Sequence, residues 1–506
     1  MNISKIFSAQ LYGLSTHIIS IEVDLSNGLH SFSIVGLGDK AIDESKDRIS
    51  AAIKNTGYIS PKQKNQKVVI SLAPADIRKE GPSFDLGMAL AYLVASGDID
   101  FDPKDRIFLG ELSLSGEIRK VSGILPLIRG VKDMGYKEVY IPIDNSEEAG
   151  LVNNINIYPC RNLNEIINHL TKDNYKIKKL NKTQIQYTRN ASEYDFNMIH
   201  GQEIAKRALE IAASGGHNVA MYGPPGTGKT MLARAFQTIL PDLSEDEMLE
   251  VTSIHSISKI LDKPIIRPPF RSPHHTASYA SLIGGGSYPQ PGEISLAHRG
   301  VLFLDEFPEF DRKVIESLRQ PLEEHKITIS RAKGTLTFPA KCILIASMNP
   351  CPCGFGNTNR CKCNDKDTNE YRKRISGPII DRIDMWIQVS KIDYDKLSSK
   401  LEINEKSKDI KERVENARKI QFERFNNMRI NKKYNSEMTI SDIENCIKID
   451  TDANIILKNS SEKLGLSARS YHRIIKLSQT IADLDNSTTI KKDHILEAIQ
   501  YRQKSI

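Results

Sequence analysis

The residues of this chain that most clearly carry chemistry form a glycine-rich segment, GPPGTGKT, at positions 223–230. An apolar run precedes it and a helical pattern follows it, and this order of strand, loop and helix is what a phosphate-binding loop requires. Glycines let backbone N–H groups surround phosphates, a lysine amine can reach the β- and γ-phosphates, and a threonine hydroxyl can bind Mg²⁺. The sequence therefore predicts nucleotide binding by Gly223, Pro224, Pro225, Gly226, Thr227, Gly228, Lys229 and Thr230.

A second segment, GVLFLDE at 300–306, reads as a buried parallel strand that ends in two carboxylates. Asp305 would hold Mg²⁺ together with Thr230, and Glu306 would polarise the attacking water. A solvated acidic turn after a core strand is the alternative. A further buried strand, 342–348, ends at Asn349, which can orient the water or contact the γ-phosphate. ATP and Mg²⁺ are the cofactors that this set of residues predicts.

The composition places limits on the function. A chain of 506 residues suggests three or four domains, and its net charge of +7 is compatible with nucleic acid without requiring it. No apolar stretch approaches the roughly 20 residues that span a bilayer. The first residues lack the apolar core of a signal peptide. We expect a cytoplasmic protein without a membrane partner.

Residues 1–171 alternate strand and helix patterns and predict an α+β domain, followed by a polar linker at 172–193. The segment KEGPS at 79–83 and the glycine-containing loop at 116–123 resemble the proteolytic domain of Lon-type proteases. Ser83 lies in the matching turn, but Leu125 stands where those enzymes have a lysine, and Lys120 lies on the other side of the Ser-Gly pair. A serine without a buried amine is a poor nucleophile. We therefore expect a Lon-like fold without peptidase activity.

Two segments near the carboxylate motif at 300–306 carry basic residues. Asp305 follows Lys229 by 76 positions, and the proline and glycine content of this stretch predicts a loop-rich insertion at 251–299. Adjacent His274 and His275 within it could be metal ligands, but no acidic partner flanks them and ordinary polar contacts are more usual. Residues 326–338 predict a β-hairpin with basic residues at its turn, for which a solvated charged turn is the alternative.

Four of the seven cysteines fall within 13 positions, as the pairs CPC and CKC. In a cytoplasmic protein this density argues against disulfides and for a tetrahedral thiolate site that binds Zn²⁺. The pairs have one intervening residue where zinc ribbons usually have two, and reduced, metal-free thiols are the alternative. The expected zinc ligands are Cys351, Cys353, Cys361 and Cys363.

Five motifs together resemble the ComM/YifB branch of the Mg-chelatase-like AAA+ ATPases: GPPGTGKT, RPPFRSPHH, PGEISLAHRGVLFLDE, SMNPCPCG and SARSYHR. The likeness runs over nearly the whole chain. The phosphate-loop motif alone is generic, whereas the insertion and the cysteine pairs are specific to this branch. The resemblance implies an α/β fold. In the implied architecture, an AAA+ P-loop core spans 194–392 and a helical lid spans 393–506. A Lon-like (ribosomal S5 domain 2-like) α+β domain precedes both in the sequence.

The resemblance also implies a function. ComM-type proteins are branch-migration helicases that extend the joint DNA molecule during natural transformation, so a homo-hexameric ring with ATP between subunits is implied, acting on single-stranded, forked or branched DNA. A recombinase on that DNA is a candidate partner. Arg382 matches the arginine finger, Arg469 matches the lid arginine called sensor 2, and His200 and Gln202 lie in the segment that covers adenine in related ATPases. The expected DNA contacts are Arg267, Arg271, His274, His275, Arg331 and Lys333.

Two other classes share parts of this pattern. A motor subunit of a magnesium-chelatase complex would have the same ATPase core, but the four-cysteine loop and the Lon-like domain fit the ComM branch better. An ATP-dependent protease would need Ser83 to be activated. ATP hydrolysis stimulated by DNA would favour the helicase. Dependence on a porphyrin-binding subunit would favour the chelatase motor, and peptide cleavage would favour the protease.

Overall fold

The computed structural model describes residues 3–183, 193–258, 261, 263–286, 290–331, 334–356, 360–391 and 404–502. The chain divides into two units, each assembled from two stretches of sequence. Unit 1 comprises Met1–Tyr187 and Glu245–Ile265, and unit 2 comprises Thr188–Ser244 and Ile266–Ile506. The sequence predicts a single insertion at 251–299. In the structure this segment is divided between the units: residues 251–265 belong to unit 1 and residues 266–299 belong to unit 2.

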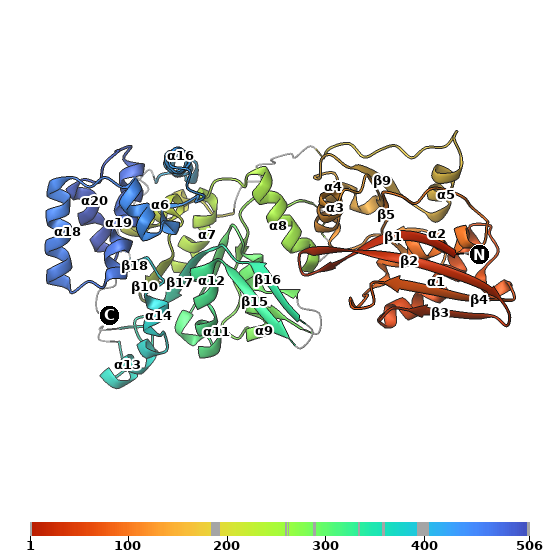
Figure 1. The fold of residues 1–506 in the computed structure, drawn as a ribbon. Helices are drawn as coiled ribbons and strands as arrows, with labels where there is room; N and C mark the ends of the chain where they lie inside the picture. The colour runs from red at the N-terminus through yellow and green to blue at the C-terminus, as the bar shows by residue number, and fades with distance from the viewer. Residues whose placement is uncertain are drawn as a thin grey trace. The chain divides into compact units, whose positions relative to one another are not determined.

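Unit 1 contains a four-stranded sheet in the order β1-β2-β4-β3, in which β3 and β4 are parallel and the other pairs are antiparallel. Helix α2 packs on β1 and β2 and is buried along almost its whole length (Figure 1). A smaller parallel sheet has the order β5-β8-β9. The bounds of these elements are β1 Ile3–Tyr12, β2 Ser15–Asn27, β3 Ser31–Val35, α1 Lys40–Asn55, β4 Gln66–Ala73, α2 Asp85–Ala95, β5 Arg106–Phe108, α3 Ile124–Asp133, β8 Glu138–Pro142, β9 Asn156–Cys160 and α5 Leu163–Thr171.

Helix α8 (Glu245–Ser258) belongs to unit 1 and packs against α3. The N–H of Gly123 donates to the carbonyl of Ser256 (3.0 Å), and the Ser256 hydroxyl donates to the Glu148 carboxylate, which also accepts from the N–H of Leu125 (3.1 Å). Leu125 is fully buried. The position where Lon-type proteases have a lysine therefore holds an apolar side chain, as the sequence predicts, at the point where α8 docks.

Unit 2 is organised around a five-stranded, all-parallel sheet in the order β11-β14-β17-β10-β18 (Figure 1). Every residue of β14 and β17 is buried, which is why both strands read as continuous apolar runs in the sequence. Helices α6 and α7 pack on β18 and β17. The bounds are α6 Glu203–Gly215, β10 Val219–Tyr222, α7 Lys229–Ile239, β11 Phe270–Arg271, β14 Val301–Leu304, β17 Ile343–Met348 and β18 Met385–Gln388.

The C-terminal part of unit 2 is helical, as the sequence predicts. The long helix α16 packs on α6, α7 and α19, and apolar residues of all four helices belong to the same core as apolar residues of the sheet strands. Arg424 of α16 pairs with the buried carboxylate of Asp483 on α19. The bounds are α16 Ser407–Asn427, α17 Ile440–Cys446, α18 Thr451–Leu464, α19 Ala468–Leu484 and α20 Lys492–Gln500.

The predicted β-hairpin is present in unit 2 as β15 (Lys326–Arg331) and β16 (Gly334–Pro339), which follow the short helix α12 (Arg319–Glu324). The two strands are antiparallel, with Lys326 opposite Pro339 and Arg331 opposite Gly334. Lys333 lies outside the described residues, so its expected place at the hairpin turn stays a prediction. Figure 1 shows the hairpin beside α12.

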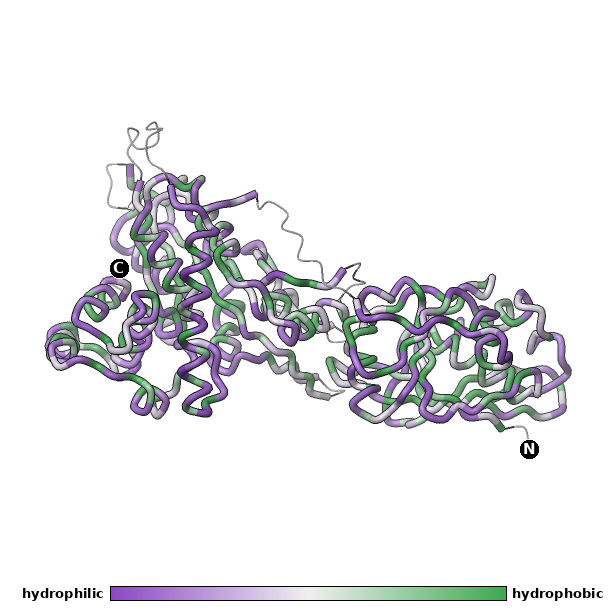
Figure 2. The backbone as a smooth tube through the Cα atoms, turned by 90° about the horizontal axis from the view of Figure 1, so that it is seen from above, coloured by the Kyte–Doolittle hydropathy of each residue, from purple (hydrophilic) through white to green (hydrophobic). Residues whose placement is uncertain are grey.

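Hydrophobic and hydrophilic positions alternate along the chain within each unit (Figure 2). Among the helices in the described part of the chain, none combines the length and the apolar character that a membrane span requires.

Candidate nucleotide-binding site

The phosphate-binding loop lies between the end of β10 and the start of α7, as the sequence predicts. Gly223 has no room for a side chain, because a Cβ there would lie 2.0 Å from the carbonyl oxygen of Val389. Gly226 and Gly228 have φ values of +75° and +87°, a left-handed conformation that favours glycine. Residues with side chains at these three positions would change the path of the loop, so the glycine spacing is a structural requirement.

Lys229 occupies the first turn of α7, with its ammonium group folded back into the loop. It donates to the carbonyls of Gly223 (2.7 Å) and Pro224 (2.9 Å) and to Oδ1 of Asn349 (3.3 Å). Burial lowers the pKa of Lys229, and the charges of Asp305 and Glu306 act in the opposite direction. A bound phosphate would offer this partly desolvated cation a charged acceptor in place of neutral carbonyls.

Thr230 and Asp305 meet as a magnesium site requires. The Thr230 hydroxyl donates to Oδ2 of Asp305 (3.0 Å), and the Ser347 hydroxyl donates to the other oxygen of the same carboxylate. Asp305 follows β14 and Ser347 lies on the neighbouring strand β17, because parallel strands bring their carboxyl ends to one edge of the sheet. Ser347 is not among the residues expected at the site, although its place two residues before Asn349, at the end of a buried strand, is a signal that could have identified it.

Glu306 has a left-handed backbone conformation (φ +51°), which is uncommon for a residue with a side chain and concentrates at functional sites. Its carboxylate lies 3.1 Å from Nδ1 of His275, and its N–H donates to Oδ1 of Asp305 (3.0 Å). The side chain of Glu306 is exposed. His275, which was expected to contact DNA, lies against the residue that would polarise the attacking water.

His200 and Gln202 precede α6 and lie near the same edge of the sheet. The amide of Gln202 donates to the carbonyl of Ser390 (2.6 Å), next to the Val389 carbonyl that faces Gly223. Nδ1 of His200 lies 3.2 Å from the side-chain nitrogen of Asn404. Gln202 therefore contacts the strand end that faces the phosphate-binding loop, whereas the role of His200 and Gln202 in covering the base stays a prediction.

The four clustered cysteines come together in space. All four sulfur atoms lie within 4.8 Å of one another, and three of the separations are 3.3, 3.6 and 3.7 Å. Zinc at its usual Zn–S distance would place the sulfurs of a tetrahedron about 3.8 Å apart. Backbone N–H groups of Phe355 and Lys362 lower the pKa of Cys353 to about 6, which favours a thiolate there, whereas burial and the neighbouring Cys353 and Cys351 raise the pKa of Cys361 and Cys363. The donor set and its geometry fit a Zn²⁺ ion.

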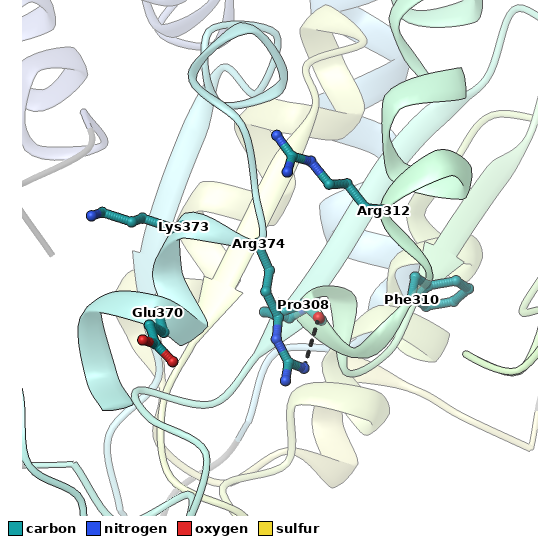
Figure 3. A pocket seen from close by; sticks show the side chains of 6 residues that line it. All are labelled: Pro308, Phe310, Arg312, Glu370, Lys373 and Arg374. Atoms are coloured by element: carbon teal, nitrogen blue, oxygen red, sulfur yellow. Dashed lines mark hydrogen bonds between the residues drawn. The ribbon is translucent and has the colours of Figure 1, made fainter. Parts of the chain in front are cut away.

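The cysteine loop packs against the nucleotide site. A Cβ at Gly354 would lie 3.1 Å from Cδ of Pro225 in the phosphate-binding loop. Helix α13 (Asp365–Lys373) follows the loop, and Arg374 beyond it donates to the carbonyl of Pro308 (3.4 Å) and to the Glu309 carboxylate (2.7 Å), as Figure 3 shows for Pro308. The loop therefore contacts the phosphate-binding loop directly, and the residue after α13 contacts Glu309, three residues after Glu306. A pocket of about 390 Å³ lies at this junction, lined by Pro308, Phe310, Arg312, Glu370, Lys373 and Arg374.

Arg382 and Arg469 lie at the opposite edge of the sheet. The carbonyl of Arg382 accepts from the Asn218 side chain (3.1 Å), and Asn218 directly precedes β10, whereas the phosphate-binding loop follows β10. Because a strand rises about 3.3 Å per residue, β10 separates the Arg382 carbonyl from the phosphate-binding loop by about 16 Å. This distance is longer than an arginine side chain. Both guanidinium groups instead bind the carboxylate of Glu323. The structure therefore does not bring these two arginines to the nucleotide site of their own chain.

The basic residues of the insertion are already engaged within the chain. Arg271 forms two hydrogen bonds of 2.6 Å with the Glu293 carboxylate. The rings of His274 and His275 stack with their centroids 4.1 Å apart, and Nδ1 of His274 lies 2.8 Å from the Thr276 hydroxyl. For the hairpin, Arg331 has only its backbone described. The expected contacts of these residues with DNA stay predictions.

A parallel sheet whose carboxyl edge carries a glycine-rich loop followed by a helix, with the carboxylates of Asp305 and Glu306 beside it, is the arrangement expected of a P-loop ATPase. Family models confirm the class: residues 195–397 match the magnesium chelatase subunit ChlI, residues 21–145 match a further ChlI model, and residues 404–502 match the ChlI C-terminal model. The chain is 38% identical to the competence protein ComM of Haemophilus influenzae, over 99% of this chain and 98% of that protein. It is also 38% identical to the YifB protein of Escherichia coli, over 99% and 97%.

The chain therefore belongs to the family of magnesium-chelatase-like AAA+ ATPases that includes ComM and YifB. The chain is additionally similar to Lon protease 2 of Bacillus subtilis, with 31% identity over 149 residues, which cover 27% of this chain and 26% of that protein. Membership of this family implies ATP hydrolysis with ATP and Mg²⁺ as cofactors, as the sequence predicts.

Proposed function

We propose that this protein is an ATP-driven DNA motor that works as a homo-hexameric ring and moves branch points in joint DNA molecules during recombination and natural transformation. The observation that carries the proposal is the division of the catalytic groups between the two edges of the sheet. Lys229, Thr230 and Asp305 lie at one edge, and the two arginines bound by Glu323 lie at the other.

A divided site implies assembly. If Arg382 and Arg469 stabilise the charge that develops on the γ-phosphate, they must do so in a neighbouring copy of the chain, because they do not reach their own ATP. Contacts of this kind pair one edge of a subunit with the opposite edge of the next. Such head-to-tail interfaces close into a ring when the rotation allows it.

DNA is the substrate class that the remaining features favour. The chain carries a net charge of +7, and the sequence has Arg331 at the end of β15 and Lys333 between β15 and β16. A motor that moves along DNA independently of sequence must hold phosphates rather than base edges. The relative in Haemophilus influenzae bears the name of a competence protein, which agrees with a role in DNA uptake. A recombinase that forms joint molecules is the partner class that would supply the substrate.

The test of the DNA motor is ATP turnover measured with and without a four-way DNA junction. The proposal predicts that the junction stimulates hydrolysis and that duplex DNA of the same length stimulates less. A rate of ATP turnover that DNA leaves unchanged, but that a porphyrin-binding chelatase subunit increases, would replace the proposal with the metal-insertion motor. Peptide cleavage that Ser83→Ala abolishes would point to a protease.

The hairpin provides a separate prediction. Lys333→Ala should weaken DNA binding equally for all sequences, and the slope of log affinity against log salt concentration should fall by about one for each lysine that contacts a phosphate. ATP turnover without DNA should stay at the wild-type rate. Lys326→Ala, at the base of the same hairpin, is the matched control. Wild-type DNA affinity and branch movement in the Lys333 variant would remove the hairpin from the mechanism.

The cysteine loop should hold one Zn²⁺ per subunit, because four thiolates at these distances complete a tetrahedral site. Elemental analysis of protein purified without chelators should find about one zinc per chain, and close to none in a Cys351→Ser/Cys361→Ser variant. The loop packs on Pro225, so this variant should also bind ATP more weakly. Cys446→Ser, outside the cluster, should keep both the metal and the affinity. Metal-free wild-type protein would contradict the assignment.

A further inference from the structure

Glu323 joins two arginines that are far apart in the sequence. Its Oε2 accepts from Nη2 of Arg382, and its Oε1 accepts from Nη2 of Arg469 (3.4 Å). The hydrogen bond from Arg382 is the main reason why the pKa of Glu323 is below its ordinary value. One carboxylate therefore holds together the two cations that the proposed function assigns to the ATP of a neighbouring subunit.

Glu323 also lies at the root of the hairpin. It is in the last turn of α12, and one residue, His325, separates that helix from β15. Gln320 of the same helix accepts from the N–H of Thr328 (3.3 Å) and donates to the Thr328 hydroxyl (3.3 Å). These bonds attach α12 to β15, so a shift of the helix displaces the hairpin with it.

The two arginines have anchors that do not depend on Glu323. Arg382 also donates to the carbonyl of Pro378 (2.6 Å). Helix α19, which carries Arg469, is fixed next to Arg382 by Arg473, whose guanidinium donates to the carbonyl of Ile383 (2.9 Å) and lies 3.7 Å from Asp384. Removing the Glu323 charge therefore leaves both arginines on the same surface and leaves the lid attached.

We infer that Glu323 is a positioning residue that couples the neighbour-facing arginines, Arg382 and Arg469, to the DNA hairpin. The inference rests on the proposed function. Without ATP in the adjacent subunit, Glu323 holds both arginines and fixes α12. A γ-phosphate carries more negative charge than the carboxylate and competes for the same guanidinium groups, which releases Glu323 and allows α12 and the hairpin to shift.

The exposure of the cluster suits an exchange of partners. The side chain of Glu323 is 51% exposed and that of Arg469 is 46% exposed, whereas that of Arg382 is 11% exposed. The pair of Glu323 with Arg469 is accessible to water on both sides and therefore stabilises the fold only weakly, so it can be broken in each ATP cycle. The Nε of Arg382 is buried and, within the described part of the chain, has no hydrogen-bond acceptor. Its guanidinium is therefore not fully satisfied by Glu323 and Pro378.

Glu323→Gln tests the coupling, because the amide keeps the shape of the side chain and removes its charge. We expect ATP turnover without DNA to rise several-fold, since the arginines are no longer held by a carboxylate, and further stimulation by a four-way junction to disappear. Branch movement per ATP hydrolysed should fall. Glu323→Asp should recover part of the stimulation. Glu324→Gln, whose carboxylate faces Gln320 and Lys326, should keep the wild-type ratio.

A second variant separates coupling from folding. Gln320→Ala leaves Glu323 and both arginines unchanged but cuts the bonds to Thr328, so it should lose DNA stimulation while ATP turnover without DNA stays at the wild-type rate. DNA stimulation at the wild-type ratio in both Glu323→Gln and Gln320→Ala would overturn the inference. A wild-type protein that no DNA stimulates would instead contradict the proposed function on which the inference rests.

Discussion

We expect Glu306→Gln to lower the rate of ATP hydrolysis about 100-fold or more, because the proposed mechanism assigns the polarisation of the attacking water to this carboxylate. ATP binding is retained, since Lys229, Thr230 and Asp305 keep their contacts. The measurement is steady-state ATP turnover alongside the dissociation constant of a fluorescent ATP analogue.

The control for this variant is Glu370→Gln, which neutralises an exposed carboxylate at the pocket beside Arg374. It should hydrolyse ATP at the wild-type rate. A Glu306→Gln protein that turns over ATP as fast as the wild type would mean that another group polarises the water.

Arg382→Ala lowers ATP hydrolysis about 1,000-fold, the size of effect that an arginine finger has in related phosphoryl-transfer sites. ATP binding persists, because the phosphate-binding loop of the same chain is unchanged. Mixing this variant with Lys229→Ala should restore part of the activity. Some interfaces in the mixed rings then combine an intact loop from one subunit with an intact arginine from the other.

Arg312→Ala is the matched control, since Arg312 is an exposed arginine on another helix of the same unit. A site shared between subunits would be contradicted if the mixed rings recover no activity although each variant alone assembles normally. Wild-type ATP turnover in Arg382→Ala alone would also contradict a shared site.

The sheet of unit 2 and its nucleotide site could be predicted because their signals are local. Buried parallel strands read as apolar runs, and each run that ends in a polar residue places that residue at the carboxyl edge. Asp305 and Asn349 were identified in this way, and the structure brings each within hydrogen-bonding distance of Thr230 or Lys229. The four cysteines could be assigned from spacing alone for the same reason.

The remaining features depend on contacts between distant segments, which leave no pattern in the sequence. Glu323 is 59 residues from Arg382 and 146 residues from Arg469. The charged residues around Glu323 in the sequence indicate only an ordinary helix end exposed to solvent. The placement of His275 against Glu306 and of α8 on unit 1 likewise follows from tertiary packing. Propensity and periodicity describe one segment at a time and cannot show which segments meet.

The central claim is that ATP hydrolysis moves DNA branch points, and a labelled four-way junction with a mobile branch point tests it most directly. The wild-type protein with ATP and Mg²⁺ should convert the junction into its two duplex products, whereas Glu306→Gln should bind the junction and leave it unconverted. A wild-type protein that binds the junction and hydrolyses ATP without converting it would contradict the claim.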